Sequence, residues 1–151
     1  MNILVVDDER EYRTLLGDFL KMEGWTVFLA EHGEVGLKYL REEKIDFIIS
    51  DIYMPVMDGL KFHSNVRKTP GYEEVPFLFV SAYDDQHSLG FVQNPKTEGF
   101  LRKVRPLAEL KAWIQYLITP VEKRPSAPPG QETLREKPHT RSREDWRPKR
   151  H

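Results

Sequence analysis

The stretch KIDFIISDIYMPVMDGL, residues 44–60, decides how the chain folds. Its first half contains a short apolar run with almost no alternation, which is typical of a strand buried on both faces in a parallel sheet. Pro55 and Gly59 then break the strand, so that a helix can begin after it. Asp51 is therefore expected at the carboxyl end of a central strand, the edge where open α/β sheets bind ligands.

The remainder of the chain alternates between short apolar runs and segments of helical period. This alternation predicts βαβ units, and hence a five-stranded, doubly wound parallel sheet with helices on both faces. Right-handed crossovers and the position of the acidic residues favour the strand order 2-1-3-4-5. The expected strands are 3–6, 26–30, 47–50, 77–80 and 99–101. The expected helices are one that ends at Gly24, then 33–43, 60–68, 84–92 and 106–118.

Helical spacing also predicts which side chains face the core. In the first helix these are Tyr12, Leu15, Leu16, Phe19 and Leu20, and in the last they are Leu107, Leu110, Ile114, Leu117 and Ile118.

Composition divides the chain near residue 119. The 151 residues carry a net charge of −1, but residues 120–151 contribute +4 and residues 1–119 contribute −5. The second part also holds six of the eleven prolines and shows no periodicity, so we expect one globular domain over 1–119 and a disordered tail over 120–151.

The chain lacks the features of a secreted or membrane protein. There is no cysteine, the apolar run at the amino terminus is only four residues long, and no segment is long enough to span a bilayer. These features favour a soluble cytoplasmic protein.

Several polar side chains follow strands that end at one edge of the predicted sheet. They are Asp7, Asp8, Asp51, Ser81 and Lys103. Crowded carboxylates repel one another unless a cation or a proton intervenes, and all-oxygen ligands select Mg²⁺ over zinc. Mg²⁺, the lysine and the serine hydroxyl would together neutralise a phosphoryl group while one carboxylate acts as the nucleophile. Neither a glycine-rich dinucleotide motif nor a P-loop is present.

Four short motifs along the chain carry a resemblance to a known family. They are the acidic pair Asp7-Asp8, the D-x-x-M-P-x-M-D-G motif at 51–59, Val80-Ser81-Ala82 and Phe100-Leu101-Arg102-Lys103. With them the chain resembles a response-regulator receiver domain of two-component signalling, which has a flavodoxin-like or CheY-like fold.

The resemblance implies a role for each residue of the site. Asp51 would be the phosphoacceptor, and the protein ligands of Mg²⁺ would be Asp7, Asp8, Asp51 and the carbonyl of Tyr53. Ser81 would hydrogen-bond the phosphoryl group and Lys103 would pair with it, while Ser81 and Phe100 would be the switch residues.

The chain departs from the family pattern in two places. Val104 follows the lysine where the family usually has proline, and a cis bond before valine costs about 2.5–4 kcal/mol, so a trans bond is expected. Aligning Arg105-Pro106 with the usual Lys-Pro pair would spoil the inward register of the last helix. Residues 84–98, interrupted by Pro95, predict a shorter fourth helix than usual.

Three functions fit these patterns to different degrees. The best is a single-domain response regulator, phosphorylated by a sensor histidine kinase or phosphotransfer protein, that switches the binding of a downstream partner and has no DNA-binding output domain. The alternative is a phosphorylation-independent interaction module with the same fold. A magnesium phosphohydrolase is disfavoured because no general acid or cap is evident. The basic tail, with Trp146, is either a solvated terminus or a contact for nucleic acid or an acidic partner.

Overall fold

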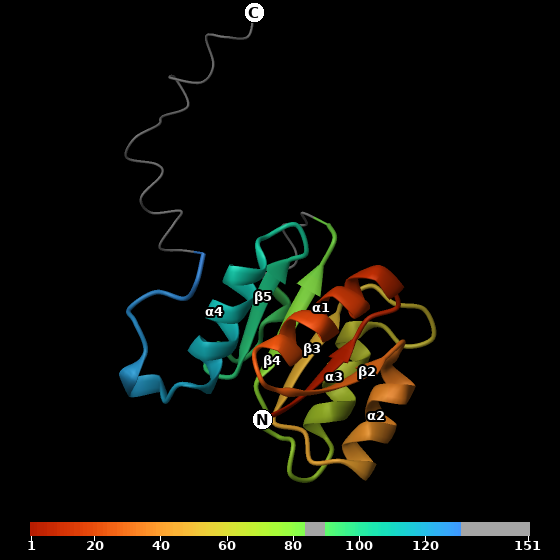
Figure 1. The fold of residues 1–151 in the computed structure, drawn as a ribbon. Helices are drawn as coiled ribbons and strands as arrows, with labels where there is room; N and C mark the ends of the chain where they lie inside the picture. The colour runs from red at the N-terminus through yellow and green to blue at the C-terminus, as the bar shows by residue number, and fades with distance from the viewer. Residues whose placement is uncertain (84–89, 131–151) are drawn as a thin grey trace, which may run out of the picture.

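The computed structural model describes residues 1–83 and 90–130 (Figure 1). Its elements along the chain are β1 (Asn2–Val6), α1 (Arg10–Met22), β2 (Thr26–Ala30), α2 (Gly33–Glu42), β3 (Phe47–Asp51), α3 (Gly59–Arg67), β4 (Phe77–Ser81), β5 (Glu98–Arg102) and α4 (Leu107–Ile118). The predicted helix over 84–92 lies largely outside the described residues. Among the described helices, none is long and apolar enough to cross a membrane.

All five strands run parallel in one sheet with the order β2-β1-β3-β4-β5, as predicted. The order reverses direction at β1, whose neighbours are β2 and β3. Val6 lies opposite Ser50 of β3, so the residues that follow β1 emerge beside Asp51. The register therefore brings the two acidic segments of the sequence together at the point where ligands bind in open α/β sheets.

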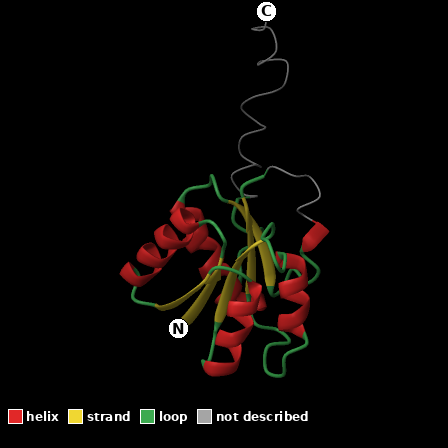
Figure 2. Ribbon diagram, turned by 90° about the vertical axis from the view of Figure 1, so that its right-hand side faces the viewer, coloured by secondary structure: helices red, strands yellow, loops and turns green. Residues whose placement is uncertain are grey.

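Helices cover both faces of the sheet (Figure 2). Alternate strand residues contribute to two separate hydrophobic cores, one on each face. On one face, β1 and its neighbours pack against α1 and α4, with Leu16 and Ile114 fully buried. On the other face they pack against α2 and α3, where Phe62 and Phe77 form a tilted ring pair. Burial on both faces explains why the central strands read as continuous apolar runs.

The prediction of which helix residues face the core is wrong for one residue in each of two helices. Leu15 of α1 is 47% exposed and Ile118 of α4 is 44% exposed. The buried residues of α1 are Leu16, Gly17 and Leu20, so Leu15 lies beside the buried face. In α4 the indole of Trp113 is buried and belongs to the core, whereas Ile118 is not. A Cβ on Gly99 of β5 would lie only 2.3 Å from this indole, so the ring occupies space that glycine leaves open.

The chain beyond α4 remains packed as far as Gly130. Arg124 donates hydrogen bonds to the carbonyls of Leu117 and Thr119 at the end of α4, and its guanidinium lies 4.9 Å from the ring centre of Tyr116. Ala127 is buried. The structure thus differs from the predicted tail over 120–130, because side chains from this segment cover part of α4. Residues 131–151 lie outside the described residues.

A buried polar network ties α3 to the start of β5. The Glu98 carboxylate lies 2.7 Å from His63 Nε2 and 3.0 Å from an amino group of Arg67, and it accepts hydrogen bonds from the backbone N–H groups of Gln93 and Asn94. Burial alone would raise the pKa of Glu98, but these partners outweigh it and lower the pKa to about 2. Glu98 is therefore held ionised, and it fixes the segment that leads into β5.

Replacing Glu98 with glutamine is expected to lower the free energy of unfolding at pH 7 by about 2 kcal/mol, since charge-assisted hydrogen bonds would become neutral ones. A lowered carboxylate pKa stabilises the fold above the unfolded value of 4.5, and this contribution is lost as the pH falls toward 2. Urea titrations should thus show a difference in the free energy of unfolding between wild type and Glu98→Gln that becomes smaller below pH 4.5. A constant gap down to pH 2.5 would contradict this assignment.

Candidate functional site

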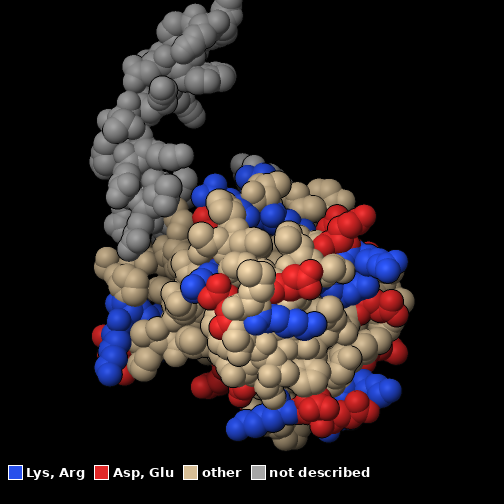
Figure 3. Space-filling model, in the orientation of Figure 1, with Lys and Arg blue, Asp and Glu red and all other residues tan. Residues whose placement is uncertain are grey.

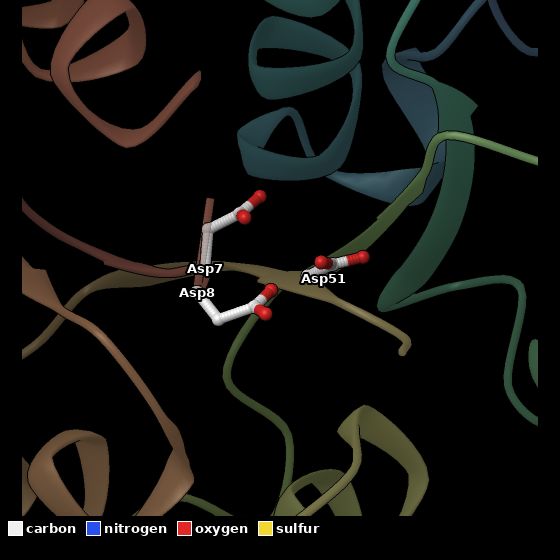
Figure 4. A group of neighbouring side chains, drawn as sticks. All are labelled: Asp7, Asp8 and Asp51. Carbon is white, nitrogen blue, oxygen red and sulfur yellow. The ribbon is translucent and has the colours of Figure 1, made fainter. Parts of the chain in front are cut away.

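Three carboxylates meet at the carboxyl ends of β1 and β3 (Figure 4). Asp7 and Asp8 follow β1 and point to different sides of the chain, while Asp51 is the last residue of β3. One oxygen from each carboxylate lies within 4.8 Å of the others. Asp7 and Asp51 are buried and Asp8 is exposed, so the cluster opens to solvent on the Asp8 side.

Lys103 reaches this cluster from the end of β5. Its ammonium lies 2.8 Å from Asp7 Oδ2, 3.1 Å from Glu9 Oε1 and 3.3 Å from Asp51 Oδ2. The backbone N–H of Lys103 donates to the carbonyl of Ser81, which continues the pairing of β4 and β5 by one residue. The lysine therefore stays in the site although Val104 follows it. Arg105, the alternative candidate, pairs instead with Glu109 on the surface.

Burial controls the charges of the cluster. It raises the pKa of Asp51 to about 6, helped by the negative charge of Asp7 and opposed by Lys103. Burial raises the pKa of Asp7 as well, against the hydrogen bond from Lys103. For Lys103 burial acts in the opposite direction, but its contacts with Asp7 and Asp51 prevail and raise its pKa. One ammonium thus faces more negative charge than it can neutralise.

The cluster fits a hard divalent cation. Asp7 Oδ2 is buried and, although it is ion-paired with Lys103, accepts no hydrogen bond of good geometry from the described residues. The available ligand atoms of the three aspartates are all oxygens, the set that Mg²⁺ prefers. A second positive charge here would relieve the repulsion that raises the pKa of Asp51.

Tyr53 follows Asp51 by two residues, and Ser81 ends β4, the strand that pairs with β3. Ser81 is fully buried at the end of β4, and its hydroxyl accepts a hydrogen bond from the backbone N–H of Tyr83. The rings of Tyr53 and Tyr83 form an edge-to-face pair with centres 5.3 Å apart, and both are exposed. This pair joins the loop after β3 to the loop after β4.

Phe100, the predicted switch residue, lies in the middle of β5. Phe100 is half-buried and belongs to the hydrophobic cluster on the side of α2 and α3, and Phe79 of β4 is its register partner in the sheet. Its neighbour Leu101 faces the opposite core. The structure thus places Phe100 on the edge strand of the sheet, with its side chain half-buried.

The loop between β3 and α3 is compact. Asp58 caps α3, since its Oδ1 accepts a hydrogen bond from the N–H of Lys61. Gly59 donates its N–H to the carbonyl of Ile52 across a distance of 2.7 Å. Val56 has a φ of +70°, which is unusual for a β-branched residue. The loop therefore bends tightly enough to return the chain beside the end of β3.

Residues of α1 and of the turn before it complete the site, and the sequence patterns did not single them out. Glu9 contacts Lys103, and Arg13 donates to the backbone carbonyl of Asp7. Tyr12, expected only as a core residue, places its ring 4.8 Å from the Lys103 ammonium. The spacing of these residues after Asp7 was visible, but only the fold shows that the first turn of α1 faces the end of β5.

Lysine, arginine and acidic side chains are interspersed over the face of the molecule seen in Figure 3. No single-sign patch of the kind that binds nucleic acid stands out on the described part of this face.

Comparisons with known proteins show which family this chain is similar to. The family model for the response regulator receiver domain matches residues 3–115. A probable chemotaxis protein CheY from Rhizobium etli is 31% identical over 116 residues, which cover 76% of this chain and 90% of that protein. The transcriptional regulatory protein GlrR from Escherichia coli is 39% identical over 83 residues, 54% of this chain but only 18% of GlrR.

Solved structures show the same architecture. The chemotaxis protein CheY4 from Vibrio cholerae aligns with a TM-score of 0.72 at 27% identity, covering 78% of this chain and 98% of that one. The response regulator TrrA from Thermotoga maritima, solved in complex with Mg²⁺ and BeF, aligns with a TM-score of 0.65 at 31% identity over the same shares of the two chains. With its five parallel strands, its acidic cluster and the matched family model, this chain belongs to the response-regulator receiver-domain family.

Proposed function

We propose that the chain is a single-domain response regulator that accepts a phosphoryl group on Asp51 in a Mg²⁺-dependent reaction. The observation that carries the proposal is the convergence of three carboxylates and Lys103, with Asp51 at the end of the central strand. The donor would be a sensor histidine kinase or a phosphotransfer protein. The CheY relative, 90% of which is matched, supports the single-domain form.

In the proposed reaction an oxygen of Asp51 attacks phosphorus as the bond to the donor nitrogen breaks, giving an acyl phosphate. Bound Mg²⁺, held by Asp7, Asp8, Asp51 and the carbonyl of Tyr53, would supply positive charge to the phosphoryl oxygens. Lys103 would pair with another of these oxygens, and the Ser81 hydroxyl would donate a hydrogen bond to them. Catalysis would therefore rest on positioning and charge rather than on a separate acid or base.

Two features of the site bear on how the phosphorylated state would act. The proposed output is a change in the binding of a downstream protein, with Ser81 and the half-buried ring of Phe100 as switch residues. The protein would also hydrolyse its own acyl phosphate slowly, and the exposed pair of Tyr53 and Tyr83 would limit the access of water. Because a histidine kinase draws on ATP, the proposed compartment is the cytoplasm.

Intact-protein mass spectrometry after incubation with acetyl phosphate and Mg²⁺ tests this function. The wild-type protein is expected to gain one phosphoryl group, and the gain should be absent in Asp51→Asn and in wild type treated with EDTA. Beryllofluoride with Mg²⁺ serves as a second probe, because some receivers refuse small donors. If neither treatment changes the mass or the NMR spectrum of the wild type, the proposal fails and the phosphorylation-independent docking module takes its place.

A further inference from the structure

The ammonium of Lys103 contacts two kinds of group, carboxylates and an aromatic ring. Three carboxylates, those of Asp7, Glu9 and Asp51, surround its ammonium at 2.8–3.3 Å. The ring of Tyr12 lies against the same ammonium, with its centre 4.8 Å from Nζ. This distance is within the range of a cation–π contact, which is strongest where water is excluded. The lysine side chain is only 9% exposed, so the contact is largely desolvated.

The carboxylates alone do not determine where the ammonium lies. They offer acceptors at similar distances, and the nearest one belongs to Asp7 rather than to Asp51. The backbone gives little further restraint, because the chain leaves β5 directly after the hydrogen bond from Lys103 to Ser81 and Val104 is exposed. A flexible four-carbon side chain in this setting needs another contact to keep its charge beside Asp51.

The Tyr12 ring is well placed to supply that contact. It is fixed in the first turns of α1, where it packs against the hydrophobic core shared with α4. Burial raises the pKa of its hydroxyl to about 12, so the ring is neutral near pH 7. A neutral ring does not bind a divalent cation. With Mg²⁺ held by the aspartates, their attraction for Lys103 would fall, whereas the attraction of the ring would remain.

We propose that Tyr12 is a positioning residue that holds the Lys103 ammonium beside Asp51 through the face of its ring. This inference rests on the proposed phosphoryl transfer, to which it adds a residue that touches neither the phosphoryl group nor the metal. The ring performs its role through the lysine, and its hydroxyl is not required.

The experiment compares Tyr12→Phe, which keeps the ring face, with Tyr12→Leu, which keeps only apolar volume. Phe19→Leu is the matched control, because Phe19 packs against the same core further along α1. The first readout is the NMR shift of the Lys103 ε-methylene protons, assigned by their loss in Lys103→Met. These protons are expected upfield in wild type and Tyr12→Phe, with and without Mg²⁺, and at ordinary positions in Tyr12→Leu.

The second readout is the initial rate of phosphorylation by acetyl phosphate. We expect Tyr12→Leu to react about tenfold more slowly than wild type, as losing a desolvated cation–π contact implies, and Tyr12→Phe to react within about twofold of it. In the Lys103→Met background, Tyr12→Leu should have no additional effect.

Three results would overturn the inference: equal losses in Tyr12→Phe and Tyr12→Leu, an equal loss in Phe19→Leu, or a full effect of Tyr12→Leu without Lys103. If the wild type accepts no phosphoryl group, the proposed function fails by itself. The ring-current shift then still decides whether Tyr12 holds the lysine.

Discussion

Asp51→Asn is expected to make the metal-free protein more stable at pH 7.5, by up to about 3 kcal/mol, although it removes the proposed phosphoacceptor. The reason is that ionised Asp51 is unfavourable in the folded state. Burial and the neighbouring charge of Asp7 raise its pKa from 3.8 to about 6, despite the attraction of Lys103. Each pKa unit corresponds to about 1.4 kcal/mol, and asparagine avoids this cost with nearly the same shape.

The added stability of Asp51→Asn should increase with pH. A carboxyl with a raised pKa binds its proton more tightly in the folded state, so the wild type loses stability as the pH rises from 3.8 through about 6. The asparagine variant lacks this loss. The difference in the free energy of unfolding between the two proteins is therefore small at pH 4, increases up to pH 6 and is constant above about pH 7.

Urea titrations at pH 4, 5, 6 and 7.5 in the presence of EDTA measure the difference directly. Asp18→Asn is the control, because Asp18 is an exposed carboxylate on α1 that does not belong to the cluster. Adding Mg²⁺ should stabilise the wild type more than Asp51→Asn and so reduce the gap, because a ligand stabilises the state that binds it. A variant no more stable than wild type at pH 7.5 would refute the crowding of charges inferred here.

Much of the fold could be predicted because its signals are local. Residues 47–50 were predicted as a strand buried on both faces, and the structure buries every residue of β3, which extends to Asp51. The order of the strands followed from the alternation of strands and helices together with the handedness of crossovers. The cluster of Asp7, Asp8 and Asp51 followed as well, since parallel strands deliver their carboxyl ends to one edge of the sheet.

What could not be predicted depends on contacts between distant segments. Leu15 and Ile118 have the spacing of core residues, but each lies beside the buried face of its helix and is exposed. The side-chain partners of Glu98 come from α3, and no local pattern connects them with it. Residues 120–130 have the composition of a disordered tail, yet Arg124 donates hydrogen bonds to the backbone carbonyls of Leu117 and Thr119 at the end of α4. In each case the deciding free energy comes from tertiary contacts rather than from propensity.

Gly59→Ala is expected to lower the free energy of unfolding by about 3 kcal/mol, the upper part of the range for overpacking. A Cβ at this position would lie 2.2 Å from the backbone carbonyl oxygen of Asp51 and 2.7 Å from Cα of Ile52. Both neighbours are backbone atoms of the segment that ends β3, so no side-chain rotation relieves the clash. Either the start of α3 moves away, breaking the hydrogen bond from Gly59 to Ile52, or the end of β3 shifts.

Gly59→Ala should also affect the site, because the clash would displace Asp51. Gly59→Ala should therefore slow phosphorylation by acetyl phosphate even at a temperature where circular dichroism shows the variant folded. Gly90→Ala provides the matched control, since a Cβ there meets nothing within 4 Å, and it should change stability by less than about 0.5 kcal/mol. A Gly59→Ala protein with wild-type stability and rate would mean that the loop after β3 can yield. The close approach of α3 to β3 would then not be what fixes the position of Asp51.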